Sequence, residues 1–221
     1  MTFAPPPGAL ACRGLLIDFG GVLTTSVFAS FAAFEQAERL DRFAVARLLR
    51  DDPRAAKLLV GLETGGAADA VFENELAALL GVAPERLIKR LLGGTRPERS
   101  MIDAVRELRR AGVRTALVSN SWGTATYPEA LLNDLFDAVV ISGQIGLRKP
   151  EPEIYRLAAQ KIGLDPAECV FVDDLPNNLG PAARLGMGVI RHTTPAVTIA
   201  QLAGIFGIEL TVPDLGTAQP R

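Results

Sequence analysis

Four places in the chain put charged or hydroxyl-bearing residues at the end of a short apolar run. The side chains at these places are Asp18, Ser119 with Asn120, Lys149, and Asp173 with Asp174. A carboxylate at the end of a buried strand costs free energy unless something compensates its charge. Three carboxylates and one lysine in a shared pocket would leave two negative charges without a partner, and a divalent cation is the simplest remedy. Oxygen ligands of this kind suit Mg²⁺ together with a phosphate.

Each of these residues also has an ordinary structural explanation. The aspartates and the Ser119-Asn120 pair could cap helices and turns, and Lys149 could form a surface ion pair. All of the strand ends together favour a binding site. Ser119 and Asn120 would offer a hydroxyl, an amide and N–H groups to an anion, and Lys149 precedes Pro150, which fixes the chain.

The elements that must position these residues alternate between strand and helix. Apolar runs predict strands at Arg13–Asp18, Val113–Ser119, Asp137–Ile141, Glu168–Asp173 and Gly188–Arg191. Helical periodicity predicts helices at Arg96–Ala111, Tyr127–Leu135, Glu151–Ile162, Asn177–Leu185 and Val197–Phe206. This alternation indicates an α/β fold, a Rossmann-like parallel sheet with helices on both faces. Ligands of such sheets bind beyond the carboxyl ends of the strands, where the polar residues lie.

The segment 27–95 breaks the alternation, because it contains helical patterns and no convincing strand. This pattern indicates an inserted helical cap. The sequence therefore predicts a core formed by residues 1–26 and 96–221, with the cap between its two parts.

Composition excludes several classes of function. The formal net charge of −2 gives no electrostatic reason to expect nucleic acid as a partner. No apolar run reaches ~18 residues, so no membrane span is expected. The start of the chain lacks the basic region of a signal peptide, and we expect a cytoplasmic location with Cys12 and Cys169 as free thiols.

Other catalytic chemistries have little support in the sequence. His192 is the only histidine, so it is expected to be structural rather than part of a triad. The glycine-rich stretches lack the P-loop pattern, and no cluster of cysteine and histidine suggests zinc.

Four motifs in order along the chain resemble those of the haloacid dehalogenase-like hydrolase superfamily. They are Asp18-Phe-Gly-Gly-Val-Leu-Thr, Leu-Val-Ser119-Asn120, Lys149-Pro-Glu-Pro and Phe-Val-Asp173-Asp174. The segment 27–95 resembles the small helical cap of this superfamily. The segment from Ser119 to Leu185 is also similar to the N-terminal phosphatase domain of soluble epoxide hydrolases.

The resemblance implies a phosphatase with Mg²⁺ as its cofactor and a small phosphorylated molecule as its substrate. Asp18 would be the nucleophile and would form an aspartyl-phosphate that water hydrolyses. The ion would be held by Asp18, the backbone carbonyl of Gly20 and Asp174, with Asp173 in the outer shell.

The resemblance also implies roles around the phosphate. Ser119, Asn120 and Gly21 would lie at the phosphoryl oxygens, and Lys149 would orient Asp18 and neutralise charge. Asn178 would support the site from behind. Trp122 would line the cap interface or pack in the core.

One position departs from the pattern of the family's phosphatases. They usually carry a second aspartate two residues after the nucleophile, which protonates the leaving oxygen, and here that position is Gly20. General acid–base catalysis contributes typically ~10²–10⁴-fold, so ordinary alkyl phosphates should react slowly. Thr24, Thr25 and the acids of the cap are the candidate replacements.

Three alternatives follow. The protein is a Mg²⁺-dependent hydrolase that acts on phosphates with good leaving groups or takes its acid from the cap or the substrate, a metal-independent hydrolase of the dehalogenase type, or a phospho-ligand binding or regulatory module without turnover. The retained Asp173-Asp174 pair argues against the dehalogenase, because paired acids have little purpose without a cation.

Overall fold

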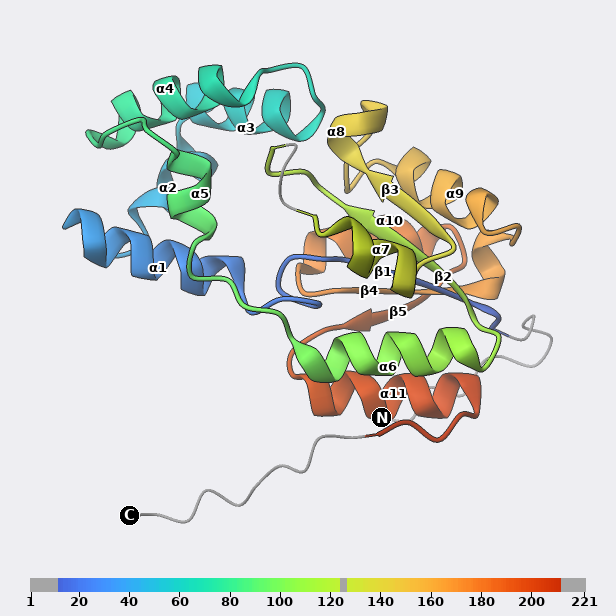
Figure 1. Ribbon diagram of the computed structural model, residues 1–221. Coiled ribbons are helices and arrows are strands. Elements are labelled where there is room, and N and C mark those ends of the chain that lie inside the picture. Colours follow the sequence, from blue (N-terminus) through green and yellow to red (C-terminus); the bar gives the residue numbers. More distant parts are fainter. Residues whose placement is uncertain (1–11, 124–126, 212–221) are drawn as a thin grey trace, which may run out of the picture.

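The computed structural model describes residues 12–123 and 127–211. Its centre is a parallel sheet in the order β3-β2-β1-β4-β5 (Figure 1). The strands are β1 (Gly14–Ile17), β2 (Arg114–Ser119), β3 (Ala138–Ile141), β4 (Cys169–Asp173) and β5 (Gly188–Arg191). Each lies within one residue of its predicted bounds at either end. The predicted α/β fold is therefore confirmed.

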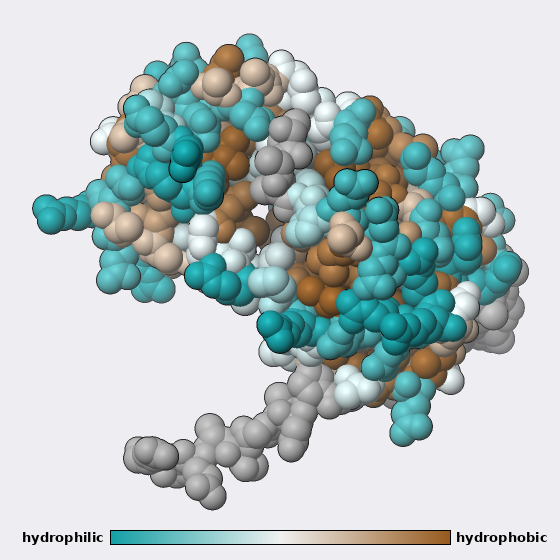
Figure 2. Space-filling view, in the orientation of Figure 1, coloured by the Kyte–Doolittle hydropathy of each residue, from teal (hydrophilic) through white to brown (hydrophobic). Residues whose placement is uncertain are grey.

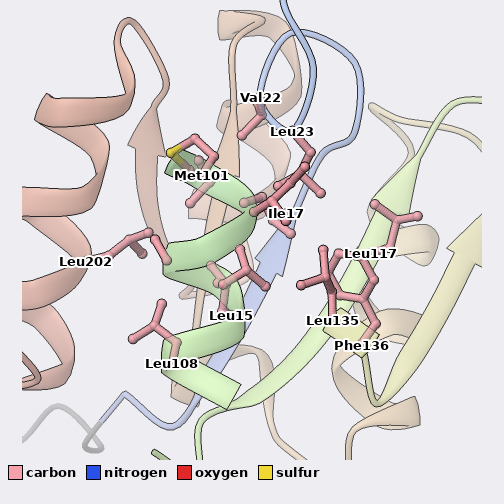
Figure 3. Packing of buried hydrophobic residues seen from close by; sticks show 14 of the residues in the cluster. Leu15, Ile17, Val22, Leu23, Met101, Leu108, Leu117, Leu135, Phe136 and Leu202 are labelled. Carbon is pink, nitrogen blue, oxygen red and sulfur yellow. The ribbon is translucent and has the colours of Figure 1, made fainter. Parts of the chain in front are cut away.

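Helices cover both faces of the sheet. The helices of one face are α6 (Arg99–Arg110), α7 (Glu129–Leu135) and α11 (Pro195–Phe206), and those of the other are α9 (Pro152–Lys161) and α10 (Pro176–Arg184). Successive residues of a strand point to opposite faces. In β1, Leu15 and Ile17 pack with Leu108 of α6, as Figure 3 shows, while Leu16 packs with Ile154 of α9. Burial on both faces explains why β1 is apolar throughout. Packing from both sides fixes the position of its carboxyl end.

Five helices form a separate body, which we call the helical unit. It consists of α1 (Val27–Glu38), α2 (Ala44–Asp51), α3 (Pro53–Glu63), α4 (Asp69–Leu80) and α5 (Leu87–Leu92). Its own apolar cluster contains Phe34, Phe72 and Leu76. The buried carboxylate of Glu35 accepts the N–H groups of Phe43 and Val45, which fastens α1 to the start of α2.

Two short connections lie side by side where the chain enters and leaves the helical unit. Thr24 forms a bridge with Pro97, and the N–H of Thr25 donates to the carbonyl of Arg96 at 2.8 Å. The helical unit lies beyond the carboxyl ends of the strands (Figure 1), and in the space-filling view it forms one of two lobes (Figure 2). The cap boundaries at 27 and 95 remain a prediction.

The structure differs from the predicted elements in several places, among them the start of α11, which lies two residues before the predicted Val197. Helix α7 begins two residues later than expected, because Pro128 disfavours a helical conformation of Tyr127 before it. Helix α6 begins at Arg99 because Pro97 takes part in the bridge with Thr24. The short α8 (Ser142–Ile145) was not predicted, since one turn of helix has no periodicity to recognise.

Two further sequence expectations can be compared with the structure. Cys12 and Cys169 are both free thiols, as predicted. None of the helices within the described ranges combines the length and the apolar character that spanning a bilayer requires.

Candidate active site

Three carboxylates meet at the carboxyl edge of the sheet. Asp18 follows β1 directly and is held in line by its N–H bond to the carbonyl of Val172, at 3.0 Å. Asp173 ends the neighbouring β4, and Asp174 follows it. Each of the three offers an oxygen, and these oxygens all lie within 4.8 Å of one another. Parallel pairing of β1 with β4 brings together residues that are far apart in sequence.

Lys149 links two of the three acids. Its Nζ lies 2.7 Å from Asp18 Oδ1 and 2.7 Å from Asp173 Oδ2, and the residue is buried. Its backbone is held by Asn120, whose Nδ2 donates to the Lys149 carbonyl at 3.0 Å and whose Oδ1 accepts the Lys149 N–H at 2.8 Å. The side chain of Asn120 therefore holds the backbone of Lys149 through both its amide nitrogen and its oxygen.

The acids differ in how many bonds they already make. Asp173 is fully buried and accepts from Lys149, from the Asn178 side chain and from the N–H of Leu175. Asp18 Oδ1 accepts the N–H of Phe19 at 2.7 Å as well as the lysine, whereas Asp18 Oδ2 has no hydrogen bond to a described residue. Asp18 Oδ2 is therefore the less engaged oxygen of Asp18, whereas both oxygens of Asp173 are already bonded within the protein.

The site carries more negative charge than Lys149 can balance. Burial raises the pKa of Asp18 to about 7; Lys149 opposes this rise, while Asp173 and Asp174 add to it. Burial and the neighbouring Asp173 raise the pKa of Asp174 to about 6. Burial disfavours the charge of Lys149, but Asp18 and Asp173 outweigh it and raise its pKa. Such an excess of buried carboxylate charge is what a bound cation would relieve.

The two glycines after Asp18 have different constraints. Gly21 has a positive φ of 78°, and a Cβ added there would lie 2.4 Å from Asp174 Oδ2. At Gly20 the backbone is not in the left-handed region, and an added Cβ would lie 3.1 Å from Val27 Cγ2 in α1. The helical unit therefore places an apolar side chain where the family's second acid would project.

The two hydroxyl groups that could donate a proton in place of the missing aspartate already form other hydrogen bonds. Thr24 Oγ1 accepts the N–H of Gly21 at 3.3 Å and donates to the Thr25 carbonyl at 3.1 Å. Thr25 Oγ1 accepts the N–H of Arg96 at 3.0 Å. Both hydroxyls thus stabilise the connection to the helical unit. Among the acids of that unit, Glu63 reaches the sheet core, where it pairs with Arg148.

Ser119 has a partner that nothing in the sequence marks. Its buried hydroxyl lies 2.9 Å from the hydroxyl of Tyr127, and the Tyr127 ring contacts Phe19 edge-on at 5.0 Å between centroids. Burial raises the pKa of Tyr127, so its phenol stays protonated and can fix the orientation of the serine. Only the folded chain brings this tyrosine to the strand end.

The side chains of two other residues singled out in the sequence have partners outside the three acids. Trp122 packs against the rings of Phe31 and Phe72, at 5.5 and 6.1 Å, so it joins the loop after β2 to the helical unit. His192 is buried, and its Nδ1 bonds with Thr198 Oγ1 at 2.9 Å, which agrees with a structural role.

Comparison with known proteins identifies the family. The model for haloacid dehalogenase-like hydrolases matches residues 12–186, which include every residue of the acidic site. This chain is a haloacid dehalogenase-like hydrolase. The predicted membership is thereby confirmed.

The hydrolase has phosphatases among its relatives. It is 31% identical over 220 residues to bifunctional epoxide hydrolase 2 of Mus musculus, covering 90% of this chain and 40% of the relative. It is 30% identical over 140 residues to the sesquiterpene phosphatase astK of Aspergillus oryzae, covering 61% of this chain and 71% of the relative. The chain spans between 10% and 40% of the length of the epoxide hydrolases and of acyl-CoA dehydrogenase family member 10 of Mus musculus, which it also matches.

The fold of the hydrolase also occurs among solved structures. The HAD family enzyme bt-2542 of Bacteroides thetaiotaomicron superposes with a TM-score of 0.63 at 21% identity, covering 83% of this chain and 95% of that one. Another structure of that enzyme is a complex with magnesium and inorganic phosphate.

Proposed function

We propose that this hydrolase is a Mg²⁺-dependent phosphatase that removes phosphate from a small molecule through an aspartyl-phosphate on Asp18. The observation that carries the proposal is the state of the Asp18 carboxylate. Lys149 and the N–H of Phe19 hold one of its oxygens, while the other makes no hydrogen bond to a described residue. A rigid, oriented carboxylate with a free oxygen is suited to nucleophilic attack.

The donor set fits Mg²⁺. Asp18 and Asp174 supply carboxylate oxygens, Gly20 supplies a backbone carbonyl, and Asp173 is already saturated by Lys149 and Asn178, so it would act from the outer shell. One or two carboxylates completed by water and phosphate is the usual arrangement for this ion. When bound, the ion would draw charge from the phosphoryl oxygens and offset the excess of carboxylates. The HAD family enzyme bt-2542, which has a similar fold, was solved with magnesium and inorganic phosphate, and this supports the choice of these two ligands.

The residues of the chain account for the chemical steps. Asp18 Oδ2 attacks phosphorus, and the bond between phosphorus and the leaving oxygen breaks. The Ser119 hydroxyl, oriented by Tyr127, and backbone N–H groups of the loop around Asn120 would donate to the phosphoryl oxygens. Water then hydrolyses the aspartyl-phosphate, which releases phosphate and restores Asp18.

The leaving group must depart without help from position 20. Val27 occupies the space beside Gly20, and Thr24 and Thr25 are engaged in the connection to the helical unit. We therefore infer that the preferred substrates are phosphate esters or anhydrides whose leaving oxygen is stable as an anion. The helical unit would act as the cap that closes over such a substrate.

The test is hydrolysis of p-nitrophenyl phosphate with Mg²⁺ and with EDTA. Its leaving group is stable as an anion, so its departure does not need a proton donor at position 20. Turnover that requires the metal supports the proposal. Turnover of a 2-haloacid that survives EDTA would favour the dehalogenase alternative, and no turnover of either compound would favour a binding module.

Binding of Mg²⁺ should depend on pH. Because the folded pKa values of Asp18 and Asp174 lie above the unfolded value of about 4, the metal-free fold is stabilised below pH ~4 and loses that contribution as the pH rises through 6 to 7. Mg²⁺ replaces the protons, so it should raise the melting temperature little at pH 5 and most at pH 8. Thermal unfolding with and without Mg²⁺ measures this. Equal increases in melting temperature on addition of Mg²⁺ at pH 5 and pH 8 would contradict this prediction.

Gly21→Ala should weaken Mg²⁺ binding by about 10–100-fold, the usual loss when the surroundings of a metal ligand are disturbed. The added methyl group would displace Asp174, with which it would overlap at 2.4 Å. Gly81→Ala is the matched control, because Gly81 has a similar φ of +70° and open space around it. Both variants should lose stability, but only Gly21→Ala should lose affinity in a calorimetric titration. Unchanged affinity for Mg²⁺ in Gly21→Ala would contradict the assignment of Asp174 as a metal ligand.

A further inference from the structure

Glu63 is an acid of the helical unit that is buried against the sheet core. It is the last residue of α3, and only 5% of its surface is exposed. Its carboxylate Oε2 lies 2.5 Å from Arg148 Nη2, and its backbone carbonyl accepts a hydrogen bond from the hydroxyl of Ser142. One residue therefore binds the core through both its side chain and its backbone.

Both core partners of Glu63 lead directly to the candidate active site. Ser142 Oγ, besides donating to Glu63, accepts the N–H of Ser121 at 2.8 Å, and Ser121 follows Asn120 in the loop after β2. Arg148 immediately precedes Lys149 in the chain. A shift of Glu63 would thus act on the anion-binding loop and on the lysine that orients Asp18.

The charges make this contact sensitive to change. Burial raises the pKa of Glu63, while Arg148 counteracts the rise. Arg148 is partly buried, with 24% of its side chain exposed, and neither Glu63 Oε2 nor Arg148 Nε makes a well-aligned hydrogen bond within the described residues. Removing one partner of such a pair leaves the other charge uncompensated, so substitution of Glu63 should weaken the contact between α3 and the core.

We propose that Glu63 is a positioning residue that makes an ordered active site depend on docking of the helical unit. This inference rests on the proposed phosphatase function. With the helical unit docked, Ser142 and Arg148 hold the Ser121 and Lys149 segments in place. With it undocked, both segments lose the contact that Glu63 supplies, so efficient catalysis is confined to the closed molecule.

The protein carries its own reporter of docking. Trp122 is its single tryptophan, it belongs to the loop after β2, and it packs against Phe31 and Phe72 of the helical unit. Undocking would expose its indole to water. Its emission and its quenching by acrylamide therefore report docking without any substrate.

The test compares Glu63→Gln with Glu38→Gln in the full chain. Glu38 is the matched control, because it pairs with Arg90 at 2.6 Å entirely inside the helical unit. Glu63→Gln should increase quenching of Trp122 and lower kcat for p-nitrophenyl phosphate by about 10–100-fold, as expected when reacting groups are misplaced by about 1 Å. Its KM should change less, and Glu38→Gln should change neither readout. Ser142→Ala, which removes a single hydroxyl, should show a weaker form of the same changes and serves if Glu63→Gln does not fold.

Two results would overturn the inference. One is wild-type kcat in folded Glu63→Gln, whether or not the quenching changes, and the other is an equal loss of kcat in Glu38→Gln. If the wild-type protein has no turnover, the proposed function fails, and the affinity for inorganic phosphate with Mg²⁺ replaces kcat. Lower phosphate affinity in Glu63→Gln alone then supports positioning by Glu63, and unchanged affinity overturns it.

Discussion

Asp18→Asn is expected to lower hydrolysis of p-nitrophenyl phosphate by more than about 10³-fold while leaving the fold intact, since removal of a nucleophile eliminates the covalent route. The Asn carbonyl can still accept the N–H of Phe19 and the ammonium of Lys149, which now bond Asp18 Oδ1. The amide would take the place of Asp18 Oδ2, which has no hydrogen bond to a described residue. No core contact is therefore lost.

The same substitution should not lower the stability of the metal-free protein. It removes the carboxylate of Asp18, whose charge is disfavoured by burial and by the neighbouring Asp173 and Asp174. We expect a melting temperature without Mg²⁺ at pH 8 equal to or above that of the wild type. Asp41→Asn, at a carboxylate exposed in the helical unit, is the control and should keep full activity. An active Asp18→Asn protein would rule out Asp18 as the nucleophile.

Gly20→Asp is expected to increase turnover of alkyl phosphates by about 10²–10⁴-fold, the usual contribution of a general acid. The backbone at Gly20 is outside the left-handed region, so a side chain is conformationally acceptable. The obstacle is Val27, whose Cγ2 would lie 3.1 Å from the new Cβ. Gly20→Asp combined with Val27→Ala provides the necessary space and should give the larger gain.

The gain should depend on the leaving group. The ratio of kcat/KM for an alkyl phosphate to that for p-nitrophenyl phosphate should rise in the acid-bearing variants, because only the alkoxide needs a proton. Gly20→Asn with Val27→Ala is the control, with the same shape and no transferable proton. Equal effects of Asp and Asn on that ratio would show that position 20 cannot supply an acid here.

The strand ends were predictable because the sheet follows from local patterns. Buried parallel strands are short apolar runs, so their carboxyl ends can be recognised in the sequence, and the meeting of Asp18, Asp173 and Asp174 follows from parallel pairing. Residues such as Glu63 and Tyr127 could not be found this way. Each lies at the end of an ordinary helix or in a loop, and its partner is decided by how the helical unit and α7 dock.

The bonding of polar side chains was also beyond the sequence. Asn120 was expected to offer its amide to an anion, whereas in the structure the amide holds the backbone of Lys149. Ser142 lies in a single-turn helix that no periodicity reveals, yet it joins Glu63 to Ser121. Whether such bonds form depends on differences of a few tenths of an ångström in the positions of the atoms, and patterns of hydrophobicity do not encode these differences.

The central position of β1 in the sheet has a consequence for the order of folding. Leu16 pairs with Ala116 on one side and with Phe171 on the other, so β1 cannot complete its bonds until segments far along the chain have arrived. The apolar cluster of the helical unit is drawn mostly from one continuous stretch of sequence and needs only short loops to close. The helical unit can therefore condense early, while the three acids come together only after β4 has added to the sheet. A chain in which β4 has not yet paired thus lacks the three-acid cluster.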